Sequence, residues 1–174
     1  MRIAMIVMVL AAGCSKAAEE PKAKPASAKV YAKGDDAPAG DVVHKIAMAE
    51  SMDVIPASKA IEQFKESAED MKAPDGCRWV HLKGAVTNKS KEEKSIKAIS
   101  VYVVDAAGKK YEISTDTSWF VEGDRLPTSI KVAPSGSSEW EAYFVVPKSA
   151  TKLAFLGTDL QFVPDVTVTV DLGM

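Results

Sequence analysis

The feature that most constrains the fold of this chain is a series of short runs between residues 78 and 172 in which apolar and polar side chains alternate. In the first run, the even positions 80–86 are apolar or glycine, whereas His81 and Lys83 fall on the other face. Such alternation is typical of a half-buried β-strand, because successive side chains of a strand point to opposite faces. This part of the chain is therefore predicted to be all-β.

Turn residues separate further runs of the same kind. Asp105 suits the start of a type I turn, and Gly108 suits the left-handed conformation that follows it. Strands separated by turns every eight to twelve residues predict an immunoglobulin-like antiparallel β-sandwich. The remaining strands are expected to follow the first, over 78–88, in the order 96–105, a return strand from Tyr111, 129–133, 139–146, 152–156 and 166–172.

One segment before these strands has helical rather than alternating spacing. Ile61, Phe64, Ala68 and Met71 recur three or four residues apart, with charged side chains between them. This spacing predicts one inserted amphipathic helix over about 58–71, near the N-terminal side of the sandwich. The helix is expected to cover one end of the core; the alternative is that it docks a partner.

The N-terminus has the character of a secretory signal. Arg2 precedes an apolar stretch over 3–12, which is too short to span a bilayer because a transmembrane helix needs about 20 apolar residues. Ala12 and Gly13 before Cys14 resemble the lipobox of bacterial prolipoproteins. The resemblance implies cleavage between Gly13 and Cys14, a lipid on Cys14 and therefore the membrane as a partner. The alternative is an ordinary signal peptide beside an unrelated cysteine.

The predicted organisation has three parts. The segment after the lipobox is rich in alanine, lysine and proline and lacks apolar periodicity, so it is interpreted as a flexible tether. Location in the cell envelope follows, and Ser15 after the cysteine resembles lipoproteins of the outer membrane where a cell has two membranes. The ranges are a signal peptide over 1–13, a lipidated tether over 14–40 and a sandwich domain over 41–174, with an early strand over 41–46 or 51–55.

Three motifs, in this order and spacing, resemble a family of immunoglobulin-like (telokin-like) domains of unknown function found in secreted bacterial lipoproteins. The resemblance covers about 78–172, and the helix before Cys77 departs from the family pattern. It implies a sandwich fold and an extracytoplasmic location, and it supplies no catalytic residues. The motifs are 79–88 ending in Thr-Asn, Asp105-x-x-Gly108-Lys109-x-Tyr111, and Pro134-x-Gly136 followed by Tyr143-Phe144-Val145-Val146-Pro147.

Charge and residue types exclude several classes of function. The chain has 22 Lys and Arg against 24 Asp and Glu, so the basic patch that binds nucleic acid is missing. Its two histidines, His44 and His81, lack the motif of a nucleophile elbow, and each is interpreted as a partly exposed surface residue. No enzymatic activity and no cofactor are expected.

No metal site is predicted. Cys77 and His81 are four residues apart, which in a strand places them about 13 Å from each other and beyond the reach of one ion. Cys77 has no intramolecular partner once Cys14 is alkylated, and is interpreted as a buried small apolar residue or a reactive thiol. Thioethers favour Cu(I) and carboxylates favour Ca²⁺, but no ligand spacing groups the candidates Met48, Met52, Met71, Glu122, Asp124, Asp35 and Asp36.

Trp119 and Phe120 are adjacent aromatics in an irregular polar stretch. Neighbouring residues of an extended chain face opposite ways, so one of the two stays exposed to bind a partner, unless both cap the sandwich. The sequence is thus interpreted as a membrane-anchored extracytoplasmic lipoprotein with a non-enzymatic immunoglobulin-like binding domain, whose partner is another envelope protein. The alternative is an envelope carrier of a small ligand or metal.

Overall fold

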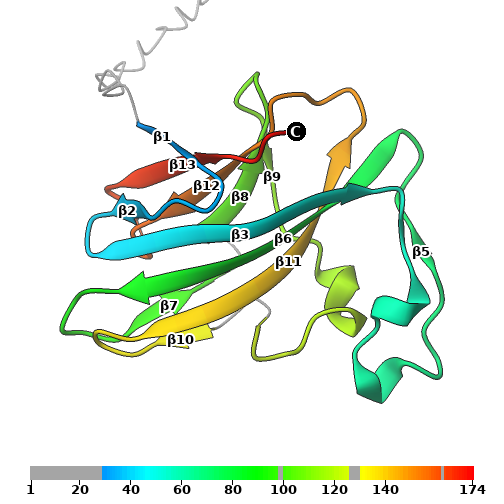
Figure 1. The fold of residues 1–174 in the computed structure, drawn as a ribbon, viewed down its shortest axis with the longest axis horizontal. Helices are drawn as coiled ribbons and strands as arrows, with labels where there is room; N and C mark the ends of the chain where they lie inside the picture. Colours follow the sequence, from blue (N-terminus) through cyan, green and yellow to red (C-terminus); the bar gives the residue numbers. More distant parts are fainter. Residues whose placement is uncertain (1–28, 98–99, 126–129, 162) are drawn as a thin grey trace, which may run out of the picture.

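The fold is built on two large β-sheets that face each other, as Figure 1 shows, and two smaller sheets of two strands each are attached to them. The computed structural model describes residues 29–97, 100–125, 130–161 and 163–174. The five-stranded sheet has the order β1 (Val30–Ala32), β13 (Thr167–Asp171), β12 (Ala154–Thr158), β8 (Val101–Val104) and β9 (Lys110–Tyr111). The four-stranded sheet has the order β11 (Ser137–Pro147), β6 (Cys77–Asn88), β3 (Val42–Met52) and β2 (Ala37–Ala39).

The main hydrophobic core lies between the two sheets. Leu82 of β6, Phe144 of β11 and Phe155 of β12 are fully buried there. The rings of Trp140 and Phe155 stack across the interface with their centroids 5.5 Å apart. Gly84 lies under the Trp140 ring, where a Cβ atom would approach the ring to 2.7 Å. The alternation of β6 therefore directs its even positions into the core, as the sequence predicts.

Most of the predicted strands match observed ones, but the run 96–105 is divided between two sheets. Its start belongs to β7 (Lys94–Ile96), which pairs with β10 (Ile130–Val132), and its end forms β8. Ser100 N donates to the Lys97 carbonyl at 2.8 Å in the connection. The early strand is β3, which is longer than either predicted range.

The hairpin after β8 has the predicted turn. Gly108 N donates to the Asp105 carbonyl at 2.9 Å, and Gly108 has the left-handed φ of 78°. The Asp105 side chain accepts hydrogen bonds from Ala107 N, Lys109 N and the Tyr111 hydroxyl. The second motif of the resemblance is therefore a set of contacts that fixes this turn, and the Tyr111 bond lowers the pKa of Asp105.

The sandwich begins before residue 41, so the predicted boundary of the tether is too late. β1 pairs in parallel with β13, and β2 pairs with β3. Ala37 and Ala39 are completely buried because their small side chains fit beneath the edge of the sheet. The alanine-rich composition predicted a tether here, but alanine is equally compatible with a buried edge strand. The signal segment, Gly13 and Cys14 lie outside the described residues.

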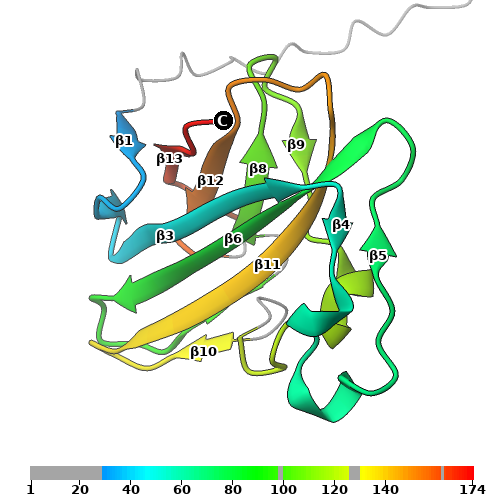
Figure 2. The same cartoon turned by 45° about the vertical axis from the view of Figure 1, so that its right-hand side comes forward.

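The predicted helix over 58–71 is wrong. The segment 53–76, here called the arm, contains two short 3-10 turns, η1 (Ala57–Lys59) and η2 (Glu62–Phe64), and a two-stranded ladder of β4 (Val54–Ile55) and β5 (Met71–Lys72). The arm leaves the ends of β3 and β6 and extends beside β11 (Figure 2). A helix of this length is marginal in water, whereas the extended ends of the arm bury Ile55 completely. Among the described residues, no helix has the length and apolarity needed to cross a membrane.

Candidate functional site

The candidate site lies on the outer face of the four-stranded sheet, the face turned away from the core. Strand register places outward side chains of β3, β6 and β11 in rows. The first row is apolar, the second mixes a histidine with a tyrosine and a carboxylate, and the third ends in an ion pair. The rows are Met52, Trp79 and Val145, then Glu50, His81 and Tyr143, then Met48, Lys83 and Glu141.

A second hydrophobic cluster covers the apolar end of this face. Trp79 and Tyr143 are buried, with ring centroids 6.5 Å apart in an edge-to-face arrangement. Trp79 Nε1 donates to the Met71 carbonyl of the arm at 3.1 Å. The other buried members come from the arm and from the chain after η4 (Thr115–Trp119): Ile55, Ala60, Phe120 and Val121.

A charged network, here called the His81 network, begins where this cover ends. His81 Nε2 donates to Glu141 Oε1 at 2.6 Å, and Lys83 Nζ donates to Glu141 Oε2 at 3.1 Å. On the other side of the ring, His81 Nδ1 lies 3.8 Å from Glu50 Oε2. Lys59 of the arm donates to the same Glu50 oxygen at 3.3 Å. The network therefore links three strands of the sheet to the arm.

Burial makes the centre of this network electrostatically sensitive. The His81 side chain is 3% exposed and that of Glu141 is 12% exposed. His81 stacks on Tyr143 with a centroid distance of 4.1 Å, and among the described residues its Nδ1 has no hydrogen-bond partner. A positive charge on His81 would therefore be matched by two carboxylates, one on each side of the ring.

The pKa directions of the neighbours agree with this geometry. Burial by itself raises the pKa of Glu141, but the hydrogen bonds from His81 and Lys83 outweigh it, so the pKa is lowered. Burial, followed by the nearby Glu141 and Glu50 carboxylates, raises the pKa of the Tyr143 hydroxyl. Glu141 is thus held as a carboxylate and Tyr143 as a neutral phenol. This arrangement suits a fixed pattern of donors and acceptors.

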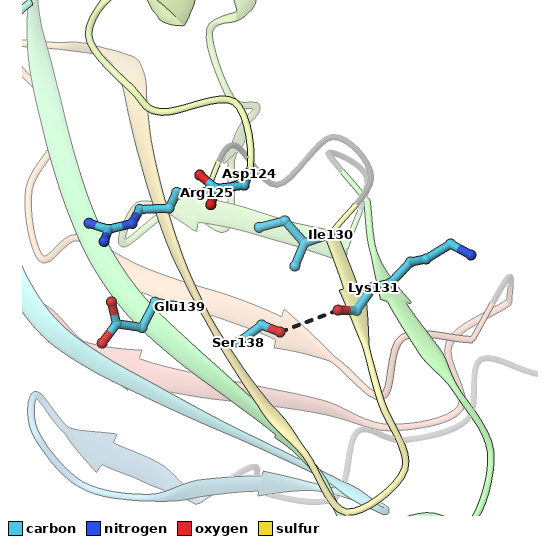
Figure 3. A pocket seen from close by; sticks show the side chains of 6 residues that line it. All are labelled: Asp124, Arg125, Ile130, Lys131, Ser138 and Glu139. Atoms are coloured by element: carbon cyan, nitrogen blue, oxygen red, sulfur yellow. Dashed lines mark hydrogen bonds between the residues drawn. The ribbon is translucent and has the colours of Figure 1, made fainter. Parts of the chain in front are cut away.

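A hollow borders the charged end of the same face (Figure 3). It has a volume of about 520 Å³, and its wall includes Arg125, Lys131 and Glu139. A second hollow of about 200 Å³ shares Arg125 and Glu139 with it and reaches Lys83 and Glu141. The larger hollow adjoins both ends of the segment 126–129, which the structure does not describe. The smaller one touches the His81 network through Lys83 and Glu141.

The structure separates Trp119 from Phe120. Trp119 is 44% exposed, and its ring stacks on Phe64 of the arm at a centroid distance of 5.2 Å. Phe120 is 4% exposed and packs in the second cluster. The Trp119 carbonyl accepts a hydrogen bond from Ile61 N, which joins this loop to the arm. One aromatic of the pair thus faces solvent and the other is covered.

Both histidines were predicted to be partly exposed, and both predictions are wrong. His81 does lie on the outer face, but its ring stacks on Tyr143 and lies between Glu141 and Glu50, so it is buried there. His44 points into the main core, where its Nε2 donates to the Thr158 carbonyl at 2.6 Å and its ring packs on Phe155. Burial lowers the pKa of His44. His44 is a core residue of the sandwich.

The remaining candidates take separate positions. Cys77 is half-buried, at the edge of a hollow lined by Asp53 and Lys148. Met52 and Met71 pack against the second cluster, and Glu122 pairs with the guanidinium of Arg125. Within the described residues, no three His, Cys, Asp or Glu side chains are close enough to hold a metal ion.

Sequence reasoning missed Glu50, Lys59, Glu141 and Tyr143. Alternation alone places Glu141 and Tyr143 on the outer face of their strand. Their proximity to His81, however, depends on strand register, which no sequence pattern here specifies. The bulge between Ile46 and Met48 changes which residues of β3 face outward and brings Glu50 opposite His81.

The comparisons with known proteins identify the fold. No family model and no curated protein matches the chain by sequence. The yjhA protein of Bacillus subtilis has 10% identity and a TM-score of 0.57, covering 82% of this chain and 99% of that one. An uncharacterised β-sandwich protein of Clostridium difficile has 14% identity and a TM-score of 0.52, covering 88% and 99%.

A third similar structure, ycdA of Bacillus subtilis, carries the description of a proposed lipoprotein. It has 16% identity and a TM-score of 0.53, and the match covers 82% of this chain but only 40% of that protein. At such identities the likeness concerns the fold alone. The chain is a β-sandwich of a kind found in uncharacterised bacterial proteins.

Proposed function

We propose that the protein is a lipid-anchored protein of the cell envelope whose β-sandwich binds another envelope protein without catalysing a reaction. The anchor is the lipid expected on Cys14. The observation that carries the binding function is the exposed Trp119, whose ring stacks on Phe64 of the same arm that reaches the His81 network through Lys59. Phe120 and Tyr143 share the second hydrophobic cluster, and Tyr143 stacks on His81.

Energetic cost supports a functional role for the His81 network. Burying ionised groups costs several kcal/mol per ion, and apolar residues of similar size would stabilise a sandwich as well or better. The His81 network nevertheless buries the carboxylate of Glu141, which is 12% exposed, against the imidazole of His81 on this sheet face. An exposed tryptophan is typical of protein-binding surfaces, where aromatic residues contribute most of the affinity.

Geometry also favours binding over catalysis. The Nε2 of His81 already donates to Glu141, and no serine, threonine or cysteine side chain of the described residues donates to that ring. The thiol of Cys77 belongs to a different hollow. A general base needs a proton to abstract within about 3 Å. Among the residues that the structure describes, the His81 ring therefore has no nucleophile beside it of the kind that hydrolytic chemistry requires.

We also infer membership of the immunoglobulin-like family named above. In its support, Asn88 and Asp105 of the shared motifs each organise a turn, and the first strand pairs in parallel with the last.

Photo-cross-linking in intact cells tests the binding function. A photoreactive amino acid at Trp119 should give a reproducible adduct with one envelope protein. The matched control is the same amino acid at Tyr102, a half-exposed aromatic on the five-stranded sheet. An adduct pattern that is the same at both positions, or the absence of any adduct, contradicts the proposal.

Replacement of the lipid-bearing cysteine tests the anchor. Two acyl chains hold a protein stably at a membrane where one is marginal. Cys14→Ala should therefore abolish labelling with radioactive palmitate and release the chain from the membrane fraction, while Cys77→Ala should change neither. Retention of the Cys14→Ala chain in that fraction would show that another element anchors it.

The second candidate function is that of a carrier for a small ligand. The smaller hollow favours it, because Lys83 and Arg125 lie there beside Glu139 and Glu141, a pattern suited to a small molecule with charges of both signs. Native mass spectrometry of the purified chain distinguishes the two candidates. A stoichiometric added mass that disappears in Lys83→Ala supports a carrier, and an unliganded mass supports the protein-binding function.

A further inference from the structure

Three exposed valines lie outside the arm and the candidate site. Large apolar side chains exposed among the described residues are Val30 at 59%, Val163 at 70%, Val166 at 40% and Trp119 at 44%. Trp119 has the arm as a neighbour. The three valines belong instead to the start of β1 and to the connection between β12 and β13.

Strand pairing places Val30 and Val166 toward the same end of the five-stranded sheet. Val30 is paired with Thr169 of β13, and Val166 precedes Thr169 by three residues, about 10 Å along a strand. A Cβ atom on Gly40 would lie 3.8 Å from that of Asp159, which places the connection beside the turn between β2 and β3. Figure 1 shows β1, β2 and the start of β13 at the end of the molecule opposite the arm.

The connection that carries Val163 and Val166 is held in shape by a buried carboxylate. Asp159 is 3% exposed. Its side chain accepts hydrogen bonds from Gln161 N, Gln161 Nε2 and Asp165 N at 3.3, 2.9 and 3.3 Å. Asp159 N in turn donates to the Val166 carbonyl at 3.1 Å. These hydrogen bonds therefore fix the backbone at Gln161, Asp165 and Val166.

We propose that this end of the sandwich rests on the lipid surface, with Val30, Val163 and Val166 inserted at the boundary between headgroups and acyl chains. The proposal rests on the lipid anchor at Cys14. From Cys14 to Val30 the chain has sixteen residues, and as the tether that the sequence predicts they would have a root-mean-square reach of about 20 Å. That reach is similar to the radius of gyration of a domain of this size, about 15 Å.

The tether compensates for the weak membrane affinity of so small a contact. Three valines by themselves bind a membrane too weakly to hold a protein there. A short flexible linker, however, raises the effective concentration of the linked surface to the millimolar range, so a weak contact is populated without further affinity. Lys29 and Asp165, the charged neighbours of Val30 and Val166, have opposite signs. The contact is therefore apolar in origin, and Trp119 and the arm face away from the membrane.

A fluorescent probe at two positions of the lipidated full-length chain tests the orientation. In a Cys77→Ala background, Val163→Cys and, as the matched control at the opposite end, Trp119→Cys are labelled with an environment-sensitive dye and reconstituted in phosphatidylcholine vesicles. A spin-labelled lipid should quench the dye at position 163 several-fold more than the dye at position 119. Val30→Asp with Val166→Asp should remove this difference.

Each alternative result overturns a stated part of the reasoning. Equal quenching at the two positions, in chains that float with the vesicles, overturns the lipid contact and leaves the anchor intact. A blue-shifted but unquenched dye at position 163 means that protein covers the valines, which also overturns the contact. Chains that carry no lipid on Cys14 and do not float overturn the anchor, and the lipid contact fails with it.

Discussion

Replacing Glu141 separates the effect of charge from the effect of a missing partner in the His81 network. Glu141→Ala leaves the buried His81 ring without its acceptor and Lys83 without its carboxylate. Breaking a buried charged pair costs about 3–5 kcal/mol. Because Lys83 is 46% exposed and can be solvated by water, we expect the lower end of this range, about 3 kcal/mol.

Glu141→Gln should cost much less. Glutamine has nearly the same volume, and its amide can donate to or accept from the imidazole, so the buried ring keeps a hydrogen bond. What is lost is the charge on the acceptor, and charge-assisted hydrogen bonds are about twice as strong as neutral ones. The expected loss in the free energy of unfolding is therefore about 1 kcal/mol.

The effect of the charge depends on pH in a definite direction. The pKa of Glu141 is lower in the folded protein than its ordinary value. The folded carboxyl therefore binds its proton less tightly than the unfolded one, whose pKa is about 4.3. The stabilisation is complete above that pH and is lost as the pH falls toward the lower folded pKa, by at most about 1.4 kcal/mol per pH unit. The advantage of the natural chain over Glu141→Gln should shrink in this window.

Urea unfolding followed by tryptophan fluorescence, from pH 7 down to about pH 3.5, measures both effects. Lys83→Ala is the control, because its ion pair is largely exposed on the lysine side and its loss should cost less than about 1 kcal/mol. Two results would contradict the reasoning: Glu141→Gln destabilises as much as Glu141→Ala, or its effect on the free energy of unfolding does not change below about pH 4.5. Either result would mean that the charge of Glu141 does not stabilise the protein through His81.

Two further substitutions test the packing of the sandwich. Gly84→Ala should destabilise the fold by about 1–3 kcal/mol in urea unfolding, because the new Cβ would lie 2.7 Å from the Trp140 ring and 2.8 Å from the Lys45 carbonyl. Gly123→Ala is the control, because its Cβ would meet nothing within 4 Å, and its effect should stay within about 0.5 kcal/mol. Asn88→Ala should cost about 3 kcal/mol, since its buried amide donates to three backbone carbonyls, and a loss below about 1 kcal/mol would mean that water replaces those bonds.

The strands could be predicted where one face is buried and turns separate them. Alternation identified β6, β11 and β13, because the main core selects every second residue of each. The turn at Asp105 and Gly108 followed from local chemistry that needs no tertiary contact. Pairing partners are not encoded in this way. The run 96–105 is divided between two sheets because its two halves pair with different strands, and the alternation of apolar and polar residues is the same in both halves.

The burial of His81 could not be predicted from the sequence, because alternation shows on which face of a strand a side chain lies but not whether other residues cover that face. His81 does face away from the main core, opposite Leu82. The outer face packs under the arm at Trp79, however, and at His81 it is covered by Tyr143 and the carboxylates of Glu50 and Glu141. Strand β6 is therefore buried on both faces from Trp79 to Leu82 and on one face from Lys83 onward. Packing of the arm on this outer face also explains the helical spacing over 58–71. Apolar residues of an irregular arm that contact an apolar patch can recur every three or four residues without forming a helix.

The arm thus determines where the outer face changes from apolar to charged, and this boundary falls at His81. On the apolar side, Trp79 is bound to the arm through its indole nitrogen. On the charged side, the arm is attached only through the Lys59–Glu50 pair, whose side chains are 39% and 47% exposed. Exposed pairs contribute at most about 1 kcal/mol. A partner that competes for Glu50 can therefore change this side of the arm without disturbing the sandwich, which is the property expected of a binding surface built on a rigid scaffold.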